Sequence, residues 1–454
     1  MSSVESAPAA LAPAASPVAS PGVATVLNRL GTWAEAAEPA AFPYDTLLTH
    51  LRSVGKHFLT DDLLTRLDEI RAALPGHPES APGSGRQDGG ETRDGIRPQD
   101  GTAFLRGFLD VVLDKYDGRY DYPSYTALSL LTRPATTDWR AARRARDEVL
   151  LLLLADLVRF EQRALTGTPD DPHGMPPESR LVAKRVRLAV RVMEPAALRA
   201  LPEGIVDATA AAAVPGRTPG GRLAADVLRA ASPAQSLLLS ASVQPVYVLH
   251  DEYLFLRTLQ SFETTFTFMA AALDAAVRRL DENRPGEAAD LVDAVAAVLK
   301  ESLPLFSLLA TMRPEAFRVF RDFTEGASAI QSAGYKTFES LCSTPGLARL
   351  ASAAYTSVPA VRERIVNGRP TVQGTWHDLI AERRLPAEES AVLQAAADRL
   401  EGVHQRWKQT HYRLAVRMIG ERSGTGYTQG VPYLAAVLEN RLFPAPDRQG
   451  ALVG

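Results

Sequence analysis

The feature that most constrains this chain is a set of long segments in which apolar residues recur every three to four positions. These segments cover residues 141–165, 180–192, 250–280, 286–312 and 387–420. Such spacing lines one face of an α-helix, and the long alternating runs of β-branched residues that indicate strands are missing. We therefore predict an all-α fold, a large helical bundle with an additional N-terminal helical region.

Three segments rich in glycine, proline and polar residues interrupt this helical pattern. The longest, Pro75 to Gly101, contains almost no apolar residue and is typical of a flexible linker. The other two, Thr166–Pro177 and Pro215–Gly221, read as shorter loops.

The breaks predict a division of the chain into three parts. Residues 1–24 are rich in Ala, Pro and Ser, and this composition favours a disordered tail. An N-terminal helical region would follow at 25–220, with the flexible linker 75–101 inside it. Residues 221–454 would form the second, larger helical domain.

The composition narrows the functional classes. The formal net charge is -3, so no basic excess indicates a nucleic-acid partner. The single cysteine, Cys342, rules out an intrachain disulfide and a cysteine-rich metal site. The N-terminus lacks the pattern of a signal peptide, and the longest apolar run, Val149–Leu157, is too short to span a bilayer. We expect a cytoplasmic protein that binds neither nucleic acid nor membranes.

Two parts of the chain echo each other. Tyr122–Leu131 precedes a helical segment that begins Arg146-Asp-Glu, and Ser236–Ser240 precedes one that begins His250-Asp-Glu. The pattern fits either a duplicated helix pair or chance similarity between leucine-rich helices, and we favour chance because such helices look alike.

Motif searches leave few enzyme classes. The sequence contains no GxGxxG, GxxxxGK[ST] or GxSxG pattern, so nucleotide binding and α/β-hydrolase chemistry lack support. There is also no HExxH pattern, and His404 and His411 lie about two turns apart on one predicted helix. That separation is too wide for both to bind one metal ion, which weighs against a non-haem metal site.

His411 lies on an apolar helix face one turn after Trp407, with Leu414, Met418 and Ile419 continuing that face. A histidine in such a place is often a hydrogen-bonded core residue. The alternative is an axial haem ligand, because imidazole binds iron well and haem needs an apolar slot.

The segment Ser423–Leu434, which follows that helix, is rich in glycine and threonine. It contains Gly424, Thr425, Gly426, Tyr427, Thr428 and Gly430. Glycines let a backbone approach a ligand closely, and N–H and hydroxyl groups would face an anion or a polar head. The alternative is an ordinary glycine-rich turn after a helix.

The segment Met312–Ser332 places Phe317, Phe320 and Arg321 on one side of a predicted helix. An arginine beside aromatic rings can bind a carboxylate in a bidentate pair while the rings hold an aromatic body. The alternative is a surface arginine whose stem covers core aromatics.

Together with His250–Glu263, these segments resemble the tryptophan 2,3-dioxygenase superfamily from about Leu228 to Leu442. The family's first signature is approximately HDExLFIxxHQxxEL, which His250–Glu263 follows. Its second is approximately MTPxxFxxFRxxLxPxSGFQS, which Met312–Ser332 follows. Its third is WxxxHxxxVxRxIG and then GTGGxSGxxYL, which Trp407–Leu434 follows. Three long motifs in this order are a specific match.

The resemblance implies a haem b enzyme and a role for each matching residue. His411 would be the proximal ligand of the haem iron, with Trp407 beside the cofactor. Arg321 would pair with the substrate carboxylate, and Thr425 would contact the substrate ammonium and carboxylate groups. The resemblance places further substrate-binding residues in the pocket or its loop, and these are Phe255, Phe317, Leu259, Gly424, Gly426 and Tyr427. It also implies a homodimer or homotetramer.

The chain departs from the family pattern at three places. Leu259 occupies the position of the family's distal histidine, and leucine can neither accept a proton nor bond to oxygen. Ala329-Ile330 replaces a Gly-Phe pair, and Gly426-Tyr427 replaces a Gly-Gly pair.

Several functions follow from the match and its departures. The chain is expected to oxygenate tryptophan or a tryptophan-like aromatic amino acid with O₂ or peroxide, by dioxygenation of the indole C2–C3 bond. The alternatives are a haem-dependent monooxygenase, peroxygenase or rearrangement enzyme of specialised metabolism. Two alternatives are not enzymes. One is a haem-based ligand sensor without turnover, and the other is a purely structural helical protein.

Overall fold

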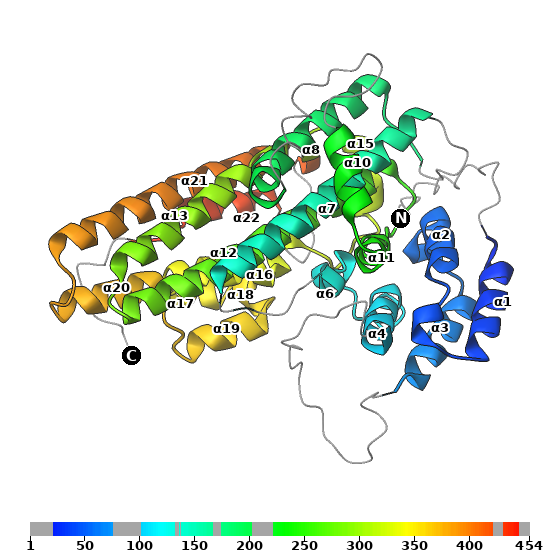
Figure 1. The fold of residues 1–454 in the computed structure, drawn as a ribbon, viewed down its shortest axis with the longest axis horizontal. Helices are drawn as coiled ribbons and strands as arrows, with labels where there is room; N and C mark the ends of the chain where they lie inside the picture. Colours follow the sequence, from blue (N-terminus) through cyan, green and yellow to red (C-terminus); the bar gives the residue numbers. More distant parts are fainter. Residues whose placement is uncertain are drawn as a thin grey trace, which may run out of the picture.

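The computed structural model describes residues 21–75, 101–131, 136, 138–166, 174–201, 221–420 and 430–444 (Figure 1). The predicted disordered tail, apart from its last residues, and nearly all of the predicted linker lie outside these ranges. So do Gly424, Thr425, Gly426 and Tyr427. Every regular element in the described ranges is a helix, apart from an isolated bridge between Gly174 and Leu249. The prediction of an all-α fold is confirmed.

The helices fall into an N-terminal and a C-terminal series. The first comprises α1 (Val23–Ala34), η1 (Pro39–Ala41), α2 (Tyr44–Val54), η2 (Lys56–Phe58), α3 (Asp61–Ala73), α4 (Gly101–Val112), α5 (Tyr122–Tyr125), α6 (Leu128–Leu131), α7 (Trp139–Thr166) and α8 (Ser179–Ala200). The second comprises α10 (Gly221–Ala230), α11 (Pro233–Ala241), α12 (His250–Asp281), α13 (Pro285–Ser302), α14 (Pro304–Leu309), α15 (Pro314–Arg321), η4 (Ala329–Gln331), α16 (Ala333–Cys342), α17 (Leu347–Leu350), α18 (Ala353–Thr356), α19 (Pro359–Val366), α20 (Val372–Ala381), α21 (Ala387–Ile419), α22 (Val431–Ala436) and η5 (Val437–Glu439).

The long helix α12 is the centre of the bundle. It packs against α7 on one side and α13 on another, and α13 in turn packs along α21 (Figure 1). Most of the α12 side chains are buried, and the polar ones among them, such as Arg257 and Gln260, are held by hydrogen bonds. The site described below lies along this helix.

The hydrophobic core does not divide at residue 220, where the proline and glycine cluster suggested a boundary. One cluster of buried residues runs from Tyr125 to Leu442 and includes the buried faces of α7 and α8. A second, smaller cluster joins α1 to α4 with α6 and Ala241. Along the chain, residues therefore pass from the smaller cluster to the larger one near α5 and α6.

Proline explains one difference from the predicted helices. The apolar pattern predicts a single helix over 286–312, but the structure has α13 ending at Ser302 and α14 beginning at Pro304. Proline lacks an N–H group and its ring clashes with the preceding turn, so it ends one helix and begins another.

A buried ionic network joins α7 and α8 to α12. The fully buried Arg185 guanidinium donates to Glu161 Oε1 at 3.0 Å and to Asp251 Oδ1 at 2.6 Å. It also donates to the Thr311 hydroxyl at 3.0 Å. Because an unpaired buried charge is very unfavourable, this network holds the N-terminal helices in one position against the C-terminal ones.

The two echoing segments occupy equivalent places. α7 and α12 pack directly against each other, α8 packs on α7, and α13 packs on α12. Short helices precede each pair, α5 and α6 in one case and α11 in the other. Each echoing segment thus begins a pair of packed helices, and the two pairs meet through α7 and α12.

Among the described residues no single helix is long and apolar enough to cross a membrane. One bent helix pair, Pro285–Leu309 with Pro314–Arg321, satisfies the length and composition test and turns by 96° at its break.

Candidate functional site

A pocket lies between α12, α15, α16 and α21, with α5 and α22 at its edges. Its apolar part is lined by Phe255, Leu259, Phe262, Phe306, Leu309, Met312, Phe317, Phe320, Ile330, Leu414 and Met418. Its polar part is lined by Tyr122, Glu263, Arg321, Ser328, Ser332, Tyr335, Lys336, Glu339, Arg349, Lys408 and Tyr433. The pocket therefore offers both an aromatic slot and charged groups.

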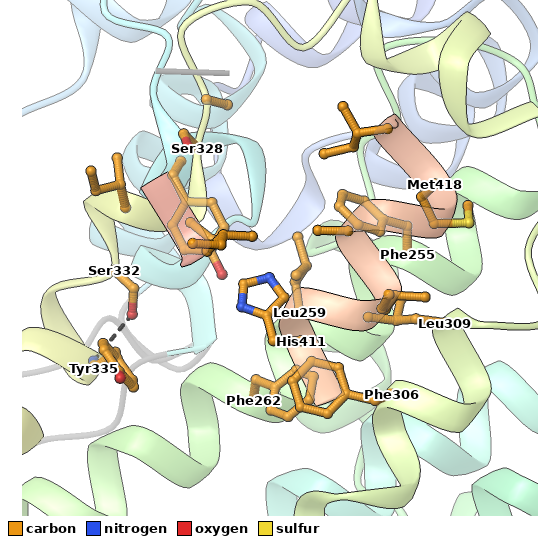
Figure 2. Close-up of a pocket in the computed structure, with 18 of the residues that line it drawn as sticks. Phe255, Leu259, Phe262, Phe306, Leu309, Ser328, Ser332, Tyr335, His411 and Met418 are labelled. Carbon is orange, nitrogen blue, oxygen red and sulfur yellow. Dashed lines mark hydrogen bonds between the residues drawn. The ribbon is translucent and has the colours of Figure 1, made fainter. Parts of the chain in front are cut away.

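His411 lies in the middle of this pocket (Figure 2). Its ring stacks on Phe306 at a centroid distance of 5.7 Å and lies 5.5 Å from the ring of Trp407. Burial lowers the pKa of the imidazole to about 4, so the ring is neutral at pH 7. Its contacts among the described residues are with aromatic rings.

The pocket gathers six of the residues predicted from sequence. These are Phe255, Leu259, Phe317, Arg321, Trp407 and His411, and they come from α12, α15 and α21. The four predicted residues of the glycine-rich loop, Gly424, Thr425, Gly426 and Tyr427, lie outside the described residues, and their roles stay predictions.

Helix α15 presents Arg321 to the pocket. Pro314 begins the helix, and Phe317 and Phe320 turn inward, where their rings meet edge to face at 5.3 Å. Phe255 of α12 packs against both rings, at 5.6 and 5.5 Å. An aromatic corner thus lies beside an arginine, the combination that suits an aromatic carboxylate.

Residues of the N-terminal half complete the wall, which sequence reasoning missed. Tyr122 and Tyr125 of α5 line the pocket, and both are buried. Asp121 caps α5 by accepting the Ser124 N–H at 2.9 Å, and the Tyr122 N–H donates to Gln331 at 3.1 Å. The Tyr122–Leu131 run stood out only as part of the echo, and nothing in the sequence linked it to the pocket.

Glu263 is a second pocket residue that the motifs did not single out as functional. It accepts a 3.0 Å hydrogen bond from the Tyr122 phenol, and burial raises its pKa to about 7 despite bonds from Ser332 and Tyr122. Gly334 allows α16 to approach here, because a Cβ on it would lie 3.1 Å from Glu263 Oε2. The pocket thus contains a carboxyl group that can hold a proton near neutral pH.

A basic cluster forms the polar end of the pocket. Glu339 pairs with Lys336 at 3.3 Å and with Arg349, and it accepts the Tyr355 hydroxyl at 3.2 Å. Burial would raise the pKa of Glu339, but the charges of Lys336 and Arg349 outweigh burial and lower it to about 2. This end therefore carries one more basic than acidic group and suits an anionic substituent.

The fold and the pocket define a class: an all-α protein with a neutral histidine in a large aromatic pocket. Comparison with known proteins gives the family. The chain is 30% identical over 237 residues to tryptophan 2,3-dioxygenase of Anaeromyxobacter sp. (strain K), a match that covers 46% of this chain and 89% of that protein. The corresponding enzymes of Anaeromyxobacter dehalogenans (strain 2CP-C) and Bacillus thuringiensis (strain Al Hakam) are each 28% identical, over 45% and 43% of this chain and 89% and 82% of their own lengths.

This chain belongs to the tryptophan 2,3-dioxygenase family. The relatives match under half of its length, so the chain also carries a region additional to the matched part. No protein-family model matches the chain.

Proposed function

We propose that this protein is a haem-dependent oxygenase that acts on tryptophan or a tryptophan-like aromatic amino acid. The observation that carries the proposal is the His411 ring, which is neutral and central in an aromatic pocket. Membership of the tryptophan 2,3-dioxygenase family supports the same reading.

The residues of the pocket fit haem b. A neutral imidazole is the ligand that haem iron takes in many proteins, and Phe306 and Trp407 keep that ligand in an apolar setting. The basic cluster of Lys336 and Arg349 suits the carboxylate groups that haem carries. When bound, haem would supply the activation of O₂ or peroxide.

The other pocket residues would bind and orient the substrate. Arg321 would pair with the substrate carboxylate, and the aromatic corner of Phe255 and Phe317 would hold the indole or a related ring. In the loop after α21, Thr425 would contact the ammonium and carboxylate groups. Such positioning is the protein's own contribution to a cofactor-driven reaction.

A second outcome, monooxygenation or peroxide-driven hydroxylation, is favoured by one observation. Leu259 lines the pocket where relatives are expected to have a histidine, so the side chain at this position supplies no proton acceptor. An electron-rich indole does not strictly need a distal base, and ring dioxygenation stays our first choice.

Absorbance and product analysis test the proposal together. Protein expressed with sufficient haem should show a Soret band that shifts when L-tryptophan is added. Mass spectrometry of indole and phenol amino acids incubated with O₂ or H₂O₂ should then show products heavier by one or two oxygen atoms. Haem-replete protein without a Soret band would overturn the proposal, and a Soret band that shifts without any product would indicate a ligand sensor.

A further inference from the structure

A tyrosine–histidine pair, formed by Tyr335 of the pocket lining and the buried His404, has no part in the function proposed above. The Tyr335 phenol and His404 Nε2 are 2.8 Å apart, joining α16 to α21. His404 is 1% exposed, and its other ring nitrogen, Nδ1, has no hydrogen-bond partner among the described residues. Within that part of the chain, the Tyr335 hydroxyl is therefore the group that fixes the role of this imidazole.

The protonation states on the two sides of this hydrogen bond are clear. Burial, with the charge of Lys408, lowers the pKa of His404 to about 3 despite the opposing charge of Glu339. Burial raises the pKa of Tyr335 well above its usual value of 10. A neutral phenol therefore faces a neutral imidazole, and Nε2 can accept the phenolic proton.

The Tyr335 ring also begins a continuous series of aromatic contacts that ends at His411. Tyr335 stacks on Trp407 with centroids 5.4 Å apart and planes inclined by 21°. Trp407 lies one turn before His411, and the two ring centroids are 5.5 Å apart. Electrons pass readily between aromatic rings that touch in this way, and no other residue has to move.

Apolar rings enclose the series. Phe266 packs edge to face against both Tyr335 and Trp407, at 5.3 and 5.8 Å, and Phe338 packs against Tyr335 at 5.9 Å. The Trp407 indole N–H is buried and finds no hydrogen-bond partner in the part of the chain that the structure describes. A charge that forms on Trp407 would therefore not be stabilised locally, whereas Tyr335 can lose its proton to His404 and remain neutral.

We propose that Tyr335 is a redox-active tyrosine that donates one electron through Trp407 toward the cofactor held by His411, with His404 as the acceptor of its proton. The proposal rests on the proposed function, because it requires an oxidising cofactor at His411. The oxidant is hydrogen peroxide or an equivalent two-electron oxidant in the pocket.

The step balances in electrons and protons. Hydrogen peroxide would take up two electrons when its O–O bond breaks, one from the cofactor and one from the Tyr335 phenol. One oxygen atom would leave as water with both peroxide protons, and the other would remain in the pocket at the oxidation level of water. The phenolic O–H bond breaks as the electron leaves, and the proton moves along the 2.8 Å hydrogen bond to His404 Nε2. The products on the protein would be a neutral phenoxyl radical and an imidazolium. Two electrons taken later from the aromatic substrate would return this pair and the cofactor to their starting states, and the two protons that the substrate loses would convert the remaining oxygen into a second water.

Freeze-quench electron paramagnetic resonance of the haem-loaded protein tests the proposal. After mixing with H₂O₂, the wild-type protein should show a tyrosyl radical whose spectrum narrows when the protein is labelled with ring-deuterated tyrosine. Tyr335→Phe should lose this signal and keep its Soret band. His404→Gln keeps a side chain of similar length without a basic nitrogen, and it should lower the radical yield.

Tyr355→Phe is the matched control. Tyr355 is fully buried, at 0% exposure, and its hydroxyl bonds to Glu339, whereas Tyr335 is partly buried and stacks on Trp407. This variant should keep the radical.

The outcomes separate the two proposals. If the protein never acquires a Soret band, the proposed function is contradicted, and the redox role of Tyr335, which rests on that function, falls with it. If protein with a Soret band reacts with peroxide but forms no tyrosyl radical, or forms the same radical in Tyr335→Phe, the proposal that Tyr335 is redox-active is overturned. Either result leaves the proposed function standing.

Discussion

The Tyr122 phenol donates a 3.0 Å hydrogen bond to the Glu263 carboxylate and so joins the N-terminal half of the chain to the pocket wall. Both side chains are buried, at 3% and 4% exposure, and both line the pocket. The helices that precede α7 thus contribute directly to the wall of the pocket.

The raised pKa of Glu263 predicts a pH dependence of stability. Because the folded-state pKa lies near 7 and the ordinary value is 4.5, the folded protein binds the proton more tightly than the unfolded chain between these values. Glu263 therefore lowers the free energy of unfolding as pH rises through this window, by about 1.4 kcal/mol per pH unit at most. Glu263→Gln should remove that slope.

Urea denaturation of the two proteins at several pH values between 5 and 7 measures the effect. Glu263→Gln should gain stability relative to the wild-type protein as pH rises. Glu252, whose pKa is also raised, is present in both proteins, so its effect cancels in the difference. A constant difference across the window would show that Glu263 ionises normally.

Arg321→Leu should weaken binding of an aromatic amino acid by about 2–4 kcal/mol, the range for leaving a buried charge without its partner. Spectral titration of the haem-loaded protein with L-tryptophan measures the loss. Tryptamine lacks the carboxylate and should bind both proteins equally. Arg318→Leu, on the same helix but outside the pocket lining, should retain the wild-type affinity for L-tryptophan. Equal affinity of Arg321→Leu and wild type for L-tryptophan would place the carboxylate elsewhere.

Arg185→Met should destabilise the protein by about 3–5 kcal/mol, because it leaves Glu161 and Asp251 buried without their cation. Thermal or urea unfolding checks this value. Arg399→Met removes an arginine from an exposed pair with Asp293 and should change stability little. A small effect of Arg185→Met would mean that water or another group replaces the guanidinium.

The helices and much of the pocket could be predicted from the sequence because their determinants are local. Apolar periodicity located α7, α12 and α21. The matches to three motifs predicted that Arg321 and His411 serve the same site, and both line the pocket. Within one motif, spacing along a helix is enough to place residues on a common face.

Contacts between distant parts of the chain could not be predicted in this way. The hydrogen bond between Tyr335 and His404 joins residues on different helices, and so does the bond between Tyr122 and Glu263. Neither pair leaves a pattern at fixed spacing. The break at Pro304 was visible in the sequence, but the continuous apolar pattern around it outweighed the proline in the prediction.

The visible absorbance of His411→Ala tests the central claim most directly. The variant should lose the Soret band of the haem-loaded protein, and added imidazole should restore it by filling the space of the missing ring. His377→Ala, a change in α20 outside the pocket lining, should leave the spectrum unchanged. A His411→Ala spectrum identical to that of the wild-type protein would contradict the assignment of His411 as the haem ligand.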